Sequence, residues 1–487
     1  MHAHPSSRSA GRPVGISMAI TAGSALLPGL AHWVAGRRRA AIGIAALALT
    51  VLTGFLVLAA TTSRVELLRL AVRPGWLAAV IAGALVVALA WVVLVTGSYR
   101  VLGPVRSTGL AQVGVVLTLA VLSLLVMAPP VAVARYAYLQ RDLITDLFPD
   151  DPNGGLAAGE GGSGQSDPFA GRDRVTILLL ASDAGPDRTG VRTDSIVAAS
   201  IDTRTGDVVL LSLPRNLQQV PMPAGPLRER WPDGFPDLLN SVYEMVTESP
   251  GLLAGARDRG AEAVKRVVSY VLGIPVDYYA MVDLAGFDKF VNALGGVTVT
   301  VTERLPIGGL TANGTRVRPS GYIEPGTQRL NGEKALWYAR SRRDSTDYDR
   351  MLRQRCLIGA LVRQAEPMNV LRHFQELASA TKKLAQTDIP RSVLPDLITL
   401  GDRMHSSGSI RSIAFVPPVI STGNPDYTRI RALTKAALAK PAAPKPSATA
   451  SPSPSPSSSP SATTPRPSGT PRARATPVDV ESSCGLG

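Results

Sequence analysis

Cysteine is almost absent from this sequence: Cys356 and Cys484 are the two in 487 residues. Two thiols are too few for a disulfide scaffold or a zinc cluster, so both classes of small cross-linked domain are excluded. Aromatic residues are also scarce, at 5%, although hydrophobic residues reach 45%. Because the apolar content is mostly aliphatic, we expect it to be concentrated in membrane-spanning stretches.

Acidic residues are outnumbered, 37 against 51 basic residues, which gives a net charge of +14. This excess indicates an anionic partner, which could be nucleic acid, anionic lipid or a phosphorylated substrate. The sequence has no helix-turn-helix, zinc-finger or base-stacking signature. We therefore expect no nucleic acid among the partners.

Four apolar runs fill the first third of the chain. They cover residues 14–35, 41–61, 76–98 and 109–132. The third run has no charged residue and is long enough to cross a hydrocarbon core of ~30 Å. The first contains Pro28 and His32, so it is either a span or a re-entrant hairpin. No cleavable signal peptide is evident, because apolar runs recur instead of ending at a small-residue cleavage site. Residues 1–135 are thus predicted to be a membrane anchor with three to four transmembrane helices.

The loops between these runs predict the orientation of the anchor. Basic residues lie between the first and second runs and between the third and fourth: Arg37, Arg38, Arg39, Arg100 and Arg106. Both loops belong on the cytoplasmic side by the positive-inside rule. The remaining loop, with Arg64, Arg69 and Arg73 against Glu66, opposes this orientation with less weight. The prediction is a multi-pass protein of the cell membrane whose later part lies on the extracellular, wall-facing side.

After the anchor, the composition alternates between low-complexity and globular segments. The predicted parts are a linker at 136–173, a globular domain at 174–440, a disordered Pro/Ser/Thr-rich spacer at 441–476 and a cysteine-containing tail at 477–487. VTILLLASD, DSIVAASID and VVLLSLP are short apolar runs typical of buried strands, and GGVTVTV and SIAFVP add two more. Residues 257–272 and 351–365 have helical periodicity. The mixture suggests one α/β or α+β domain. The fold that we predict is α/β, with a mixed sheet and flanking helices.

Charged residues gather at the ends of the predicted strands and in one later segment. Asp183 follows the first strand, where α/β sheets commonly place ligands, and Asp194 and Arg215 flank the next two. Residues 335–355, ALWYARSRRDSTDYDRMLRQR, hold six arginines and three aspartates. Arginine forks bind phosphate oxygens bidentately, and carboxylates hold Mg²⁺ that bridges to phosphate. The combination favours a pyrophosphate site for phosphoryl transfer, whereas each part alone is more typical of a solvated helix face or a turn.

Four stretches resemble the LytR-CpsA-Psr family of cell-envelope phosphotransferases, in particular its actinobacterial members. They are ILLLASDAGPDRTGVRTDSIVAASID, VVLLSLPRNL, FVNALGGVTVTV and LNGEKALWYARSRRDSTDYDRMLRQR, in the family's order over most of 174–365. The resemblance implies an external domain that binds a polyprenyl-pyrophosphate-linked glycopolymer. It implies transfer of the polymer, with one phosphate, to a peptidoglycan hydroxyl, with Mg²⁺ or Mn²⁺ as cofactor.

The same resemblance assigns roles to individual residues. Asp183 and Asp194 look like the metal ligands. The residues that look catalytic, four as pyrophosphate clamps and the last as a base or metal partner, are Arg192, Arg215, Arg340, Arg342 and Asp347. The predicted substrate-binding residues are Arg188 in the loop after the first strand, Arg350, Arg353 and Gln354. Asn216 stands where many family members have aspartate.

Both cysteines follow the anchor and are predicted to lie outside the membrane, where disulfides persist. We predict the pair Cys356–Cys484, which would tie the tail back across the spacer. Two free thiols or an intermolecular bond are the alternatives.

Two other functions are compatible with the same residues. A lipid-pyrophosphate hydrolase would use water as the acceptor. A non-catalytic regulator that binds wall polymer at the membrane would show no dependence on Mg²⁺.

Overall fold

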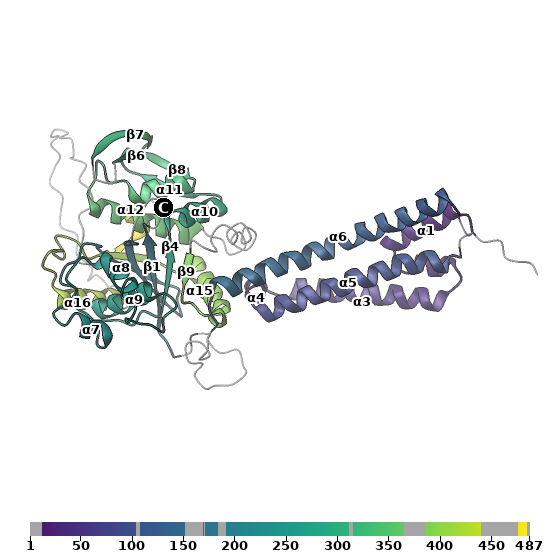
Figure 1. The fold of residues 1–487 in the computed structure, drawn as a ribbon, viewed down its shortest axis with the longest axis horizontal. Helices are drawn as coiled ribbons and strands as arrows, with labels where there is room; N and C mark the ends of the chain where they lie inside the picture. The colour runs from purple at the N-terminus through teal and green to yellow at the C-terminus, as the bar shows by residue number, and fades with distance from the viewer. Residues whose placement is uncertain are drawn as a thin grey trace, which may run out of the picture. The chain divides into compact units, whose positions relative to one another are not determined.

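The computed structural model describes residues 12–103, 108–150, 169, 171–183, 191–310, 315–364, 385–439 and 476–484. The chain divides into two units, Met1–Asp146 and Leu147–Gly487 (Figure 1). The first unit is helical, and the second contains the sheets and both cysteines.

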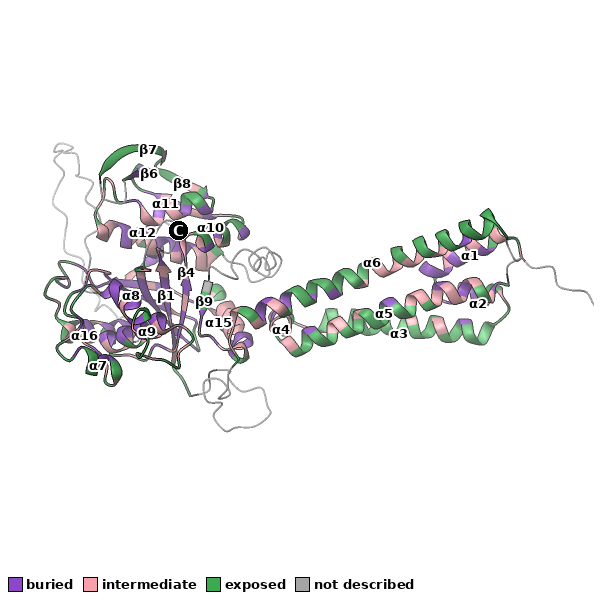
Figure 2. Ribbon diagram, in the orientation of Figure 1, coloured by how far each residue is buried: buried purple, intermediate pink, exposed green. Residues whose placement is uncertain are grey.

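Six helices make up the described part of the first unit. They are α1 (Val14–Leu26), α2 (Leu30–Val34), α3 (Arg38–Thr61), α4 (Arg64–Ala71), α5 (Pro74–Val101) and α6 (Leu110–Leu147). Three of the described helices, α3, α5 and α6, are long and apolar enough to cross a membrane. Many of their large apolar residues are exposed, and Figure 2 colours much of these helices as exposed. Such exposure is typical of helices that face lipid.

The first apolar run does not form one long helix. Pro28 and Gly29, whose φ is +98°, separate α1 from α2. The 13 residues of α1 reach only ~20 Å, less than the ~30 Å of a hydrocarbon core. Trp91 on α5 donates through Nε1 to the carbonyl of Ala25 at 3.1 Å, so α1 packs against α5. The described residues thus contain three candidate spans, where the sequence predicted three to four.

Helix α6 continues beyond the predicted anchor to Leu147, so residues 136–147, assigned to the linker from composition, are helical. Its buried residues here keep a spacing of three and four, which continues the helical pattern: Ala134, Ala137, Gln140, Leu143 and Ile144. Residues 151–168 of the predicted linker and 440–475, most of the predicted spacer, lie outside the described residues.

A seven-stranded mixed sheet forms the centre of the second unit. Across the sheet, its strands are β11 (Val478–Asp479), β10 (Ile410–Ala414), β3 (Val208–Leu213), β2 (Thr193–Asp202), β1 (Arg174–Ser182), β4 (Tyr278–Val282) and β9 (Ala385–Thr387). The first three predicted strands are β1, β2 and β3, which pair antiparallel in sequence order. β4 is parallel to β1, and β10 is parallel to β3. The predicted α/β fold with a mixed sheet is confirmed.

One hydrophobic core joins the sheet to helices α8 (Val242–Thr247), α9 (Arg259–Leu272) and α16 (Tyr427–Leu438). Helix α9 buries Val264, Val267, Val268 and Val271 completely, at the spacing of a helix with one side against the sheet. Asp258 caps its first turn by accepting a hydrogen bond from the backbone N–H of Ala261. Further described helices of this unit are α7 (Pro226–Arg230), α15 (Leu394–Ser406) and α17 (Val480–Cys484).

A second hydrophobic cluster lies in a smaller subdomain. Its elements are α10 (Leu284–Ala293), β5 (Val297–Val301), β6 (Leu305–Leu310), β7 (Arg316–Ile323), β8 (Gly326–Leu330), α11 (Gly332–Arg340) and α12 (Asp347–Gln364). β5 pairs with β8 and β6 with β7, each as a two-stranded antiparallel ribbon. Helix α12 contacts this subdomain and also strands β3 and β10 of the main sheet, so it joins the two cores.

Candidate functional site

The carboxyl ends of four strands lie at one edge of the main sheet. β1, β3, β4 and β10 run in the same direction, because β2 is antiparallel to both of its neighbours and the other two pairings are parallel. Asp183 follows β1 directly, Arg215 lies two residues after β3, and Asp194 is the second residue of β2, which begins at this edge. The topology therefore gathers these three side chains where α/β sheets place ligands.

Arg215 joins two carboxylates from different elements. Its Nη1 donates to Oδ1 of Asp194 at 2.6 Å, and its Nε lies 3.5 Å from Oδ1 of Asp347, the first residue of α12. Oδ1 of Asp347 also lies 3.8 Å from Nη1 of Arg342 and 3.0 Å from Nη2 of Arg350. We call these five residues the arginine–aspartate cluster. Its members come from β2, the end of β3, the segment before α12, and α12 itself.

The cluster carries more positive than negative charge, since three guanidinium groups against two carboxylates leave one net positive charge. Arg350 is buried and Arg215 is largely buried. Burial acts to raise the pKa of Asp194, but Arg215 and, less strongly, Arg350 and Arg342 hold that pKa below its usual range. A partly buried excess of positive charge favours a bound anion, and guanidinium forks match the oxygens of phosphate.

We expect the stability of the protein to depend on pH through Asp194. Its pKa is lower in the folded chain than the ~3.9 of an unfolded one, so its stabilisation is complete above that value and is lost as the pH falls through the folded-state pKa. Asp194→Asn should lower the free energy of unfolding at neutral pH and flatten its pH dependence below ~4. Chemical unfolding at a series of pH values measures both effects. If the free energy of unfolding depended on pH in the same way in both proteins, Asp194 would not be the group responsible.

Asp183 and Arg192 close the two ends of the loop between β1 and β2. The backbone N–H of Asp183 donates to the carbonyl of Arg192 at 3.1 Å, and the N–H of Arg192 donates to Oδ1 of Asp183 at 2.9 Å. The guanidinium of Arg192 donates through Nε to Glu244 on α8 at 3.1 Å. Arg188 lies within the loop, outside the described residues. The roles of Arg188 and Arg192 at a pyrophosphate stay predictions.

Arg353 holds the segment that carries Arg342. Its guanidinium is buried and donates to four acceptors: the carbonyls of Tyr338 and Ser341, the hydroxyl of Ser345 and, at 3.4 Å, Oε1 of Glu303. A side chain whose donors are used in this way fixes the path of the chain between α11 and α12. Direct contact between Arg353 and a substrate stays a prediction.

Arg353→Ala should lower the free energy of unfolding by about 3 kcal/mol, because two buried carbonyls then lose their donor. Thermal unfolding of the full-length protein measures the loss. The matched control is Arg266→Ala, which removes an exposed ion pair with Glu262 one helical turn away and should cost about 0.5 kcal/mol or less. Equal effects of the two substitutions would show that Arg353 does not hold the segment.

Gln354 and Arg340 also make contacts at the junction of α11 and α12. Nε2 of Gln354 donates to the carbonyl of Ala339 at 3.3 Å. The guanidinium of Arg340 lies over the ring of Trp337, 4.9 Å from its centroid. These contacts orient both side chains locally. The roles of Gln354 and Arg340 in binding substrate stay predictions.

The predicted metal ligands, Asp183 and Asp194, lie at the same end of the β1–β2 hairpin. No group of three or more His, Cys, Asp or Glu side chains among the described residues could hold a metal. Mg²⁺ is usually bound through one or two carboxylates together with substrate phosphates and water. Two aspartates are enough carboxylates for that mode, although Oδ1 of Asp194 already accepts a hydrogen bond from Arg215. Binding of Mg²⁺ or Mn²⁺ stays a prediction.

Two features of the site were missed in the sequence. Thr346 and Asp349 form a capping box at the start of α12, in which Oδ2 of Asp349 accepts from the N–H of Thr346 at 2.9 Å and the N–H of Asp349 donates to Oγ1 of Thr346 at 3.2 Å. The Thr-x-x-Asp spacing was the available signal. Asn216 and Tyr348 both contact the hydroxyl of Thr422, at 3.5 and 3.4 Å. No local pattern indicates this contact, because Thr422 is distant in sequence.

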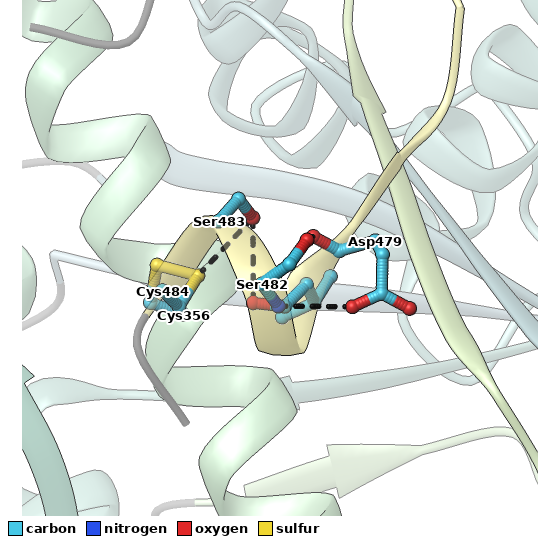
Figure 3. The surroundings of a disulfide bond; sticks show 6 residues. Cys356, Asp479, Ser482, Ser483 and Cys484 are labelled. Atoms are coloured by element: carbon cyan, nitrogen blue, oxygen red, sulfur yellow. Dashed lines mark hydrogen bonds between the residues drawn. A yellow bond between two sulfur atoms is a disulfide. The ribbon is translucent and has the colours of Figure 1, made fainter. Parts of the chain in front are cut away.

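Cys356, in α12, forms a disulfide with Cys484, the last residue of α17. This is the pair predicted from the sequence. Figure 3 shows α17 beside α12, with Ser483 next to the bond. The preceding residues of the tail form β11, which pairs with β10 at the edge of the main sheet. The disulfide therefore fixes the middle of the helix whose first turn carries Asp347 and Arg350.

The sequence model of the LytR_cpsA_psr family matches residues 158–428. Biofilm regulatory protein A of Streptococcus mutans is 29% identical over 253 residues, which cover 50% of this chain and 57% of that protein. The polyisoprenyl-teichoic acid–peptidoglycan teichoic acid transferase TagU of Enterococcus faecalis is 28% identical over 224 residues, 45% of this chain and 62% of that protein. The chain thus spans less than two thirds of the length of these relatives. The crystal structure of B. subtilis TagV aligns with a TM-score of 0.39 at 23% identity, over 54% of this chain and 95% of that one.

Proposed function

Because the chain belongs to the LytR_cpsA_psr family, we propose that it is an enzyme that transfers a glycopolymer from a polyprenyl pyrophosphate to peptidoglycan. The polymer moves together with one phosphate, and polyprenyl phosphate is released. A relative named as a polyisoprenyl-teichoic acid–peptidoglycan teichoic acid transferase supports this class of reaction.

The observation that carries the proposal is the arginine–aspartate cluster. Arg215, Arg342 and Arg350 come from separate segments and converge on one carboxylate oxygen of Asp347. Guanidinium groups held at fixed positions stabilise the charge that develops on phosphate oxygens during phosphoryl transfer. Asp347 orients them, and their net positive charge is compensated when a pyrophosphate binds.

In the proposed reaction, a hydroxyl oxygen of the acceptor sugar forms a bond to the phosphorus that carries the glycan. The bond from that phosphorus to the bridging oxygen breaks, and the bridging oxygen leaves with polyprenyl phosphate. The O–H bond of the acceptor breaks as well, and its proton is released to water. The arginines bind the nonbridging oxygens, which gain charge, and hold the leaving phosphate in place. Mg²⁺ or Mn²⁺ on Asp183 and Asp194 would add a further positive charge next to the same phosphates.

The proposed place of action is the outer surface of the cell membrane. Helices α3, α5 and α6 supply the anchor, as a multi-pass protein. With the loops at Arg37–Arg39 and at Arg100 and Arg106 inside, three spans or four leave the second unit outside. This position gives the site access to both a lipid-linked donor and the wall.

The test uses the full-length protein in nanodiscs with a synthetic polyprenyl-pyrophosphate glycan and peptidoglycan fragments. Mass spectrometry should detect glycan phosphate joined to the fragments, and the yield should disappear with a chelator and return with Mg²⁺. Glycan phosphate released equally well with and without acceptor would identify a hydrolase. Tight binding without turnover and without Mg²⁺ dependence would identify a regulator, the function in the name of the Streptococcus mutans relative.

A further inference from the structure

The β6–β7 ribbon, residues Leu305–Leu310 and Arg316–Ile323, exposes large apolar side chains, which the other described residues of its unit do not. Among the described residues of the second unit, every exposed large hydrophobic side chain is on this ribbon: Leu310 at 37%, Val317 at 43% and Tyr322 at 37%. Figure 2 shows β7 as largely exposed. Exposed apolar groups gathered on one element usually mark a contact surface.

Arginines are interleaved with these apolar residues. Arg316 and Arg318 flank Val317 and are exposed. The guanidinium of Arg304 lies over the ring of Tyr322, 3.7 Å from its centroid. Mixtures of aliphatic side chains, tyrosine and arginine are typical of surfaces at the boundary of a lipid bilayer, where the apolar part is buried and the cation meets phosphate.

The base of the ribbon is fixed and its outer part is bent. Leu305 and Ile323 pair with each other and are buried in the core of the subdomain. Further out, Gly308 and Gly309 have φ of +70° and +85°, and the register shifts at this point. Glycine adopts such angles without the strain that a Cβ atom causes. The two glycines therefore allow the bend at this point of the ribbon.

The ribbon is tied to the segment that carries Arg342 of the arginine–aspartate cluster. The hydroxyl of Ser341 donates to the carbonyl of Pro306 at 2.8 Å, and Nη2 of Arg316 donates to the carbonyl of Arg343 at 3.0 Å. The side chain of Arg343 packs over Gly309, where a Cβ atom would come within 2.6 Å of its Cδ. The ribbon is therefore held to the segment that carries Arg342.

We propose that the β6–β7 ribbon docks on the surface of an anionic lipid bilayer. The inference rests on the proposed function, because a pyrophosphate attached to a membrane lipid lies at the level of the headgroups and its binding site must approach that level. Arg316 and Arg318 contact lipid phosphates, while Leu310 and Val317 enter the outermost part of the hydrocarbon. A soluble polyanion would account for the arginines but not for the exposed aliphatic side chains.

The test places a fluorophore on the ribbon of the full-length protein. The chain has two cysteines and they form a disulfide, so Val317→Cys supplies one reactive thiol. In nanodiscs of phosphatidylglycerol and phosphatidylcholine in equal parts, an environment-sensitive label there should shift to the blue. Lipids with a nitroxide near the headgroup should quench it several-fold more than the same label at Glu248→Cys, an exposed position after α8.

Charge reversal at Arg318 to glutamate, in the Val317→Cys background, should remove a large part of the quenching and leaves the contact of Arg316 with Arg343 in place. Equal quenching at Val317 and Glu248, or quenching that survives the charge reversal, would overturn docking on anionic lipid. A label that responds to soluble poly(glycerol phosphate) but not to lipid would assign the ribbon to a polymer instead. The quenching measurement needs neither substrate nor turnover, so quenching should persist in Arg215→Ala. A failure of lipid docking can therefore be distinguished from a failure of the proposed enzymatic function.

Discussion

Arg215→Ala is expected to lower the rate of glycopolymer transfer about 10²–10³-fold, the usual cost of removing one fixed donor from a developing oxyanion. The reason is the position of Arg215 between two carboxylates, 2.6 Å from Asp194 and 3.5 Å from Asp347. Its loss removes a positive charge at the phosphate. It also leaves the carboxylates of Asp194 and Asp347 with less positive charge beside them. Turnover of the full-length protein in nanodiscs measures the effect, with folding checked by circular dichroism.

Two matched variants make the result specific. Arg215→Lys keeps the charge but loses the planar fork that reaches Asp194 and Asp347 together, so it should recover only part of the rate. Arg266→Ala removes an exposed arginine from α9 and should leave the rate unchanged. A wild-type rate in Arg215→Ala would remove the cluster from the reaction and with it the observation on which the proposed function stands.

Loss of the disulfide is expected to have the largest effect on stability. Cys356 and Cys484 are separated by 128 residues, and closing a loop of this length stabilises a protein by up to ~4–5 kcal/mol in the chain-entropy model. Replacing both cysteines with serine should lower the unfolding temperature by about 10 °C. The measurement is thermal unfolding of the full-length protein with and without a reductant.

The serine variant supplies its own control, because reductant should destabilise the native protein and leave the variant unaffected. Turnover should fall in the variant at a lower temperature than in the native protein, since α12 holds Asp347 and Arg350 in its first turn and Cys356 further along. Unchanged unfolding temperatures in all four measurements would mean that the tail does not stabilise α12.

The main strands could be predicted because their chemistry is local. The residues of β3 are all buried and apolar or small, and its sequence alone identifies it as an inner strand. The edge strands β9 and β11 have three and two residues and leave no comparable pattern. GGVTVTV was recognised as a strand, β5, yet it pairs with β8 outside the main sheet. Partner choice depends on contacts distant in sequence, which no local run encodes.

The arginines of residues 335–355 show the same limit within the site. The spacing of Asp347, Arg350 and Gln354 predicts one face of α12. In the structure Asp347 and Arg350 join the cluster, whereas Gln354 donates to the carbonyl of Ala339. Arg353 belongs to the same motif but is buried against backbone carbonyls. Residue type and spacing identified the charged group. Only the packing of α11 against α12 separates the arginines that join the cluster from those that hold the chain.

The placement of the C-terminal tail changes the connectivity of the molecule. Helix α16 ends at Leu438 and β11 begins at Val478, so the Pro/Ser/Thr-rich segment starts and finishes on the same unit. Through the Cys356–Cys484 bond, everything from residue 356 to 484 becomes a covalent ring. A protease that cuts the segment once opens the ring without releasing either piece. As long as the segment is intact, each of its residues is joined to the domain through both of its ends.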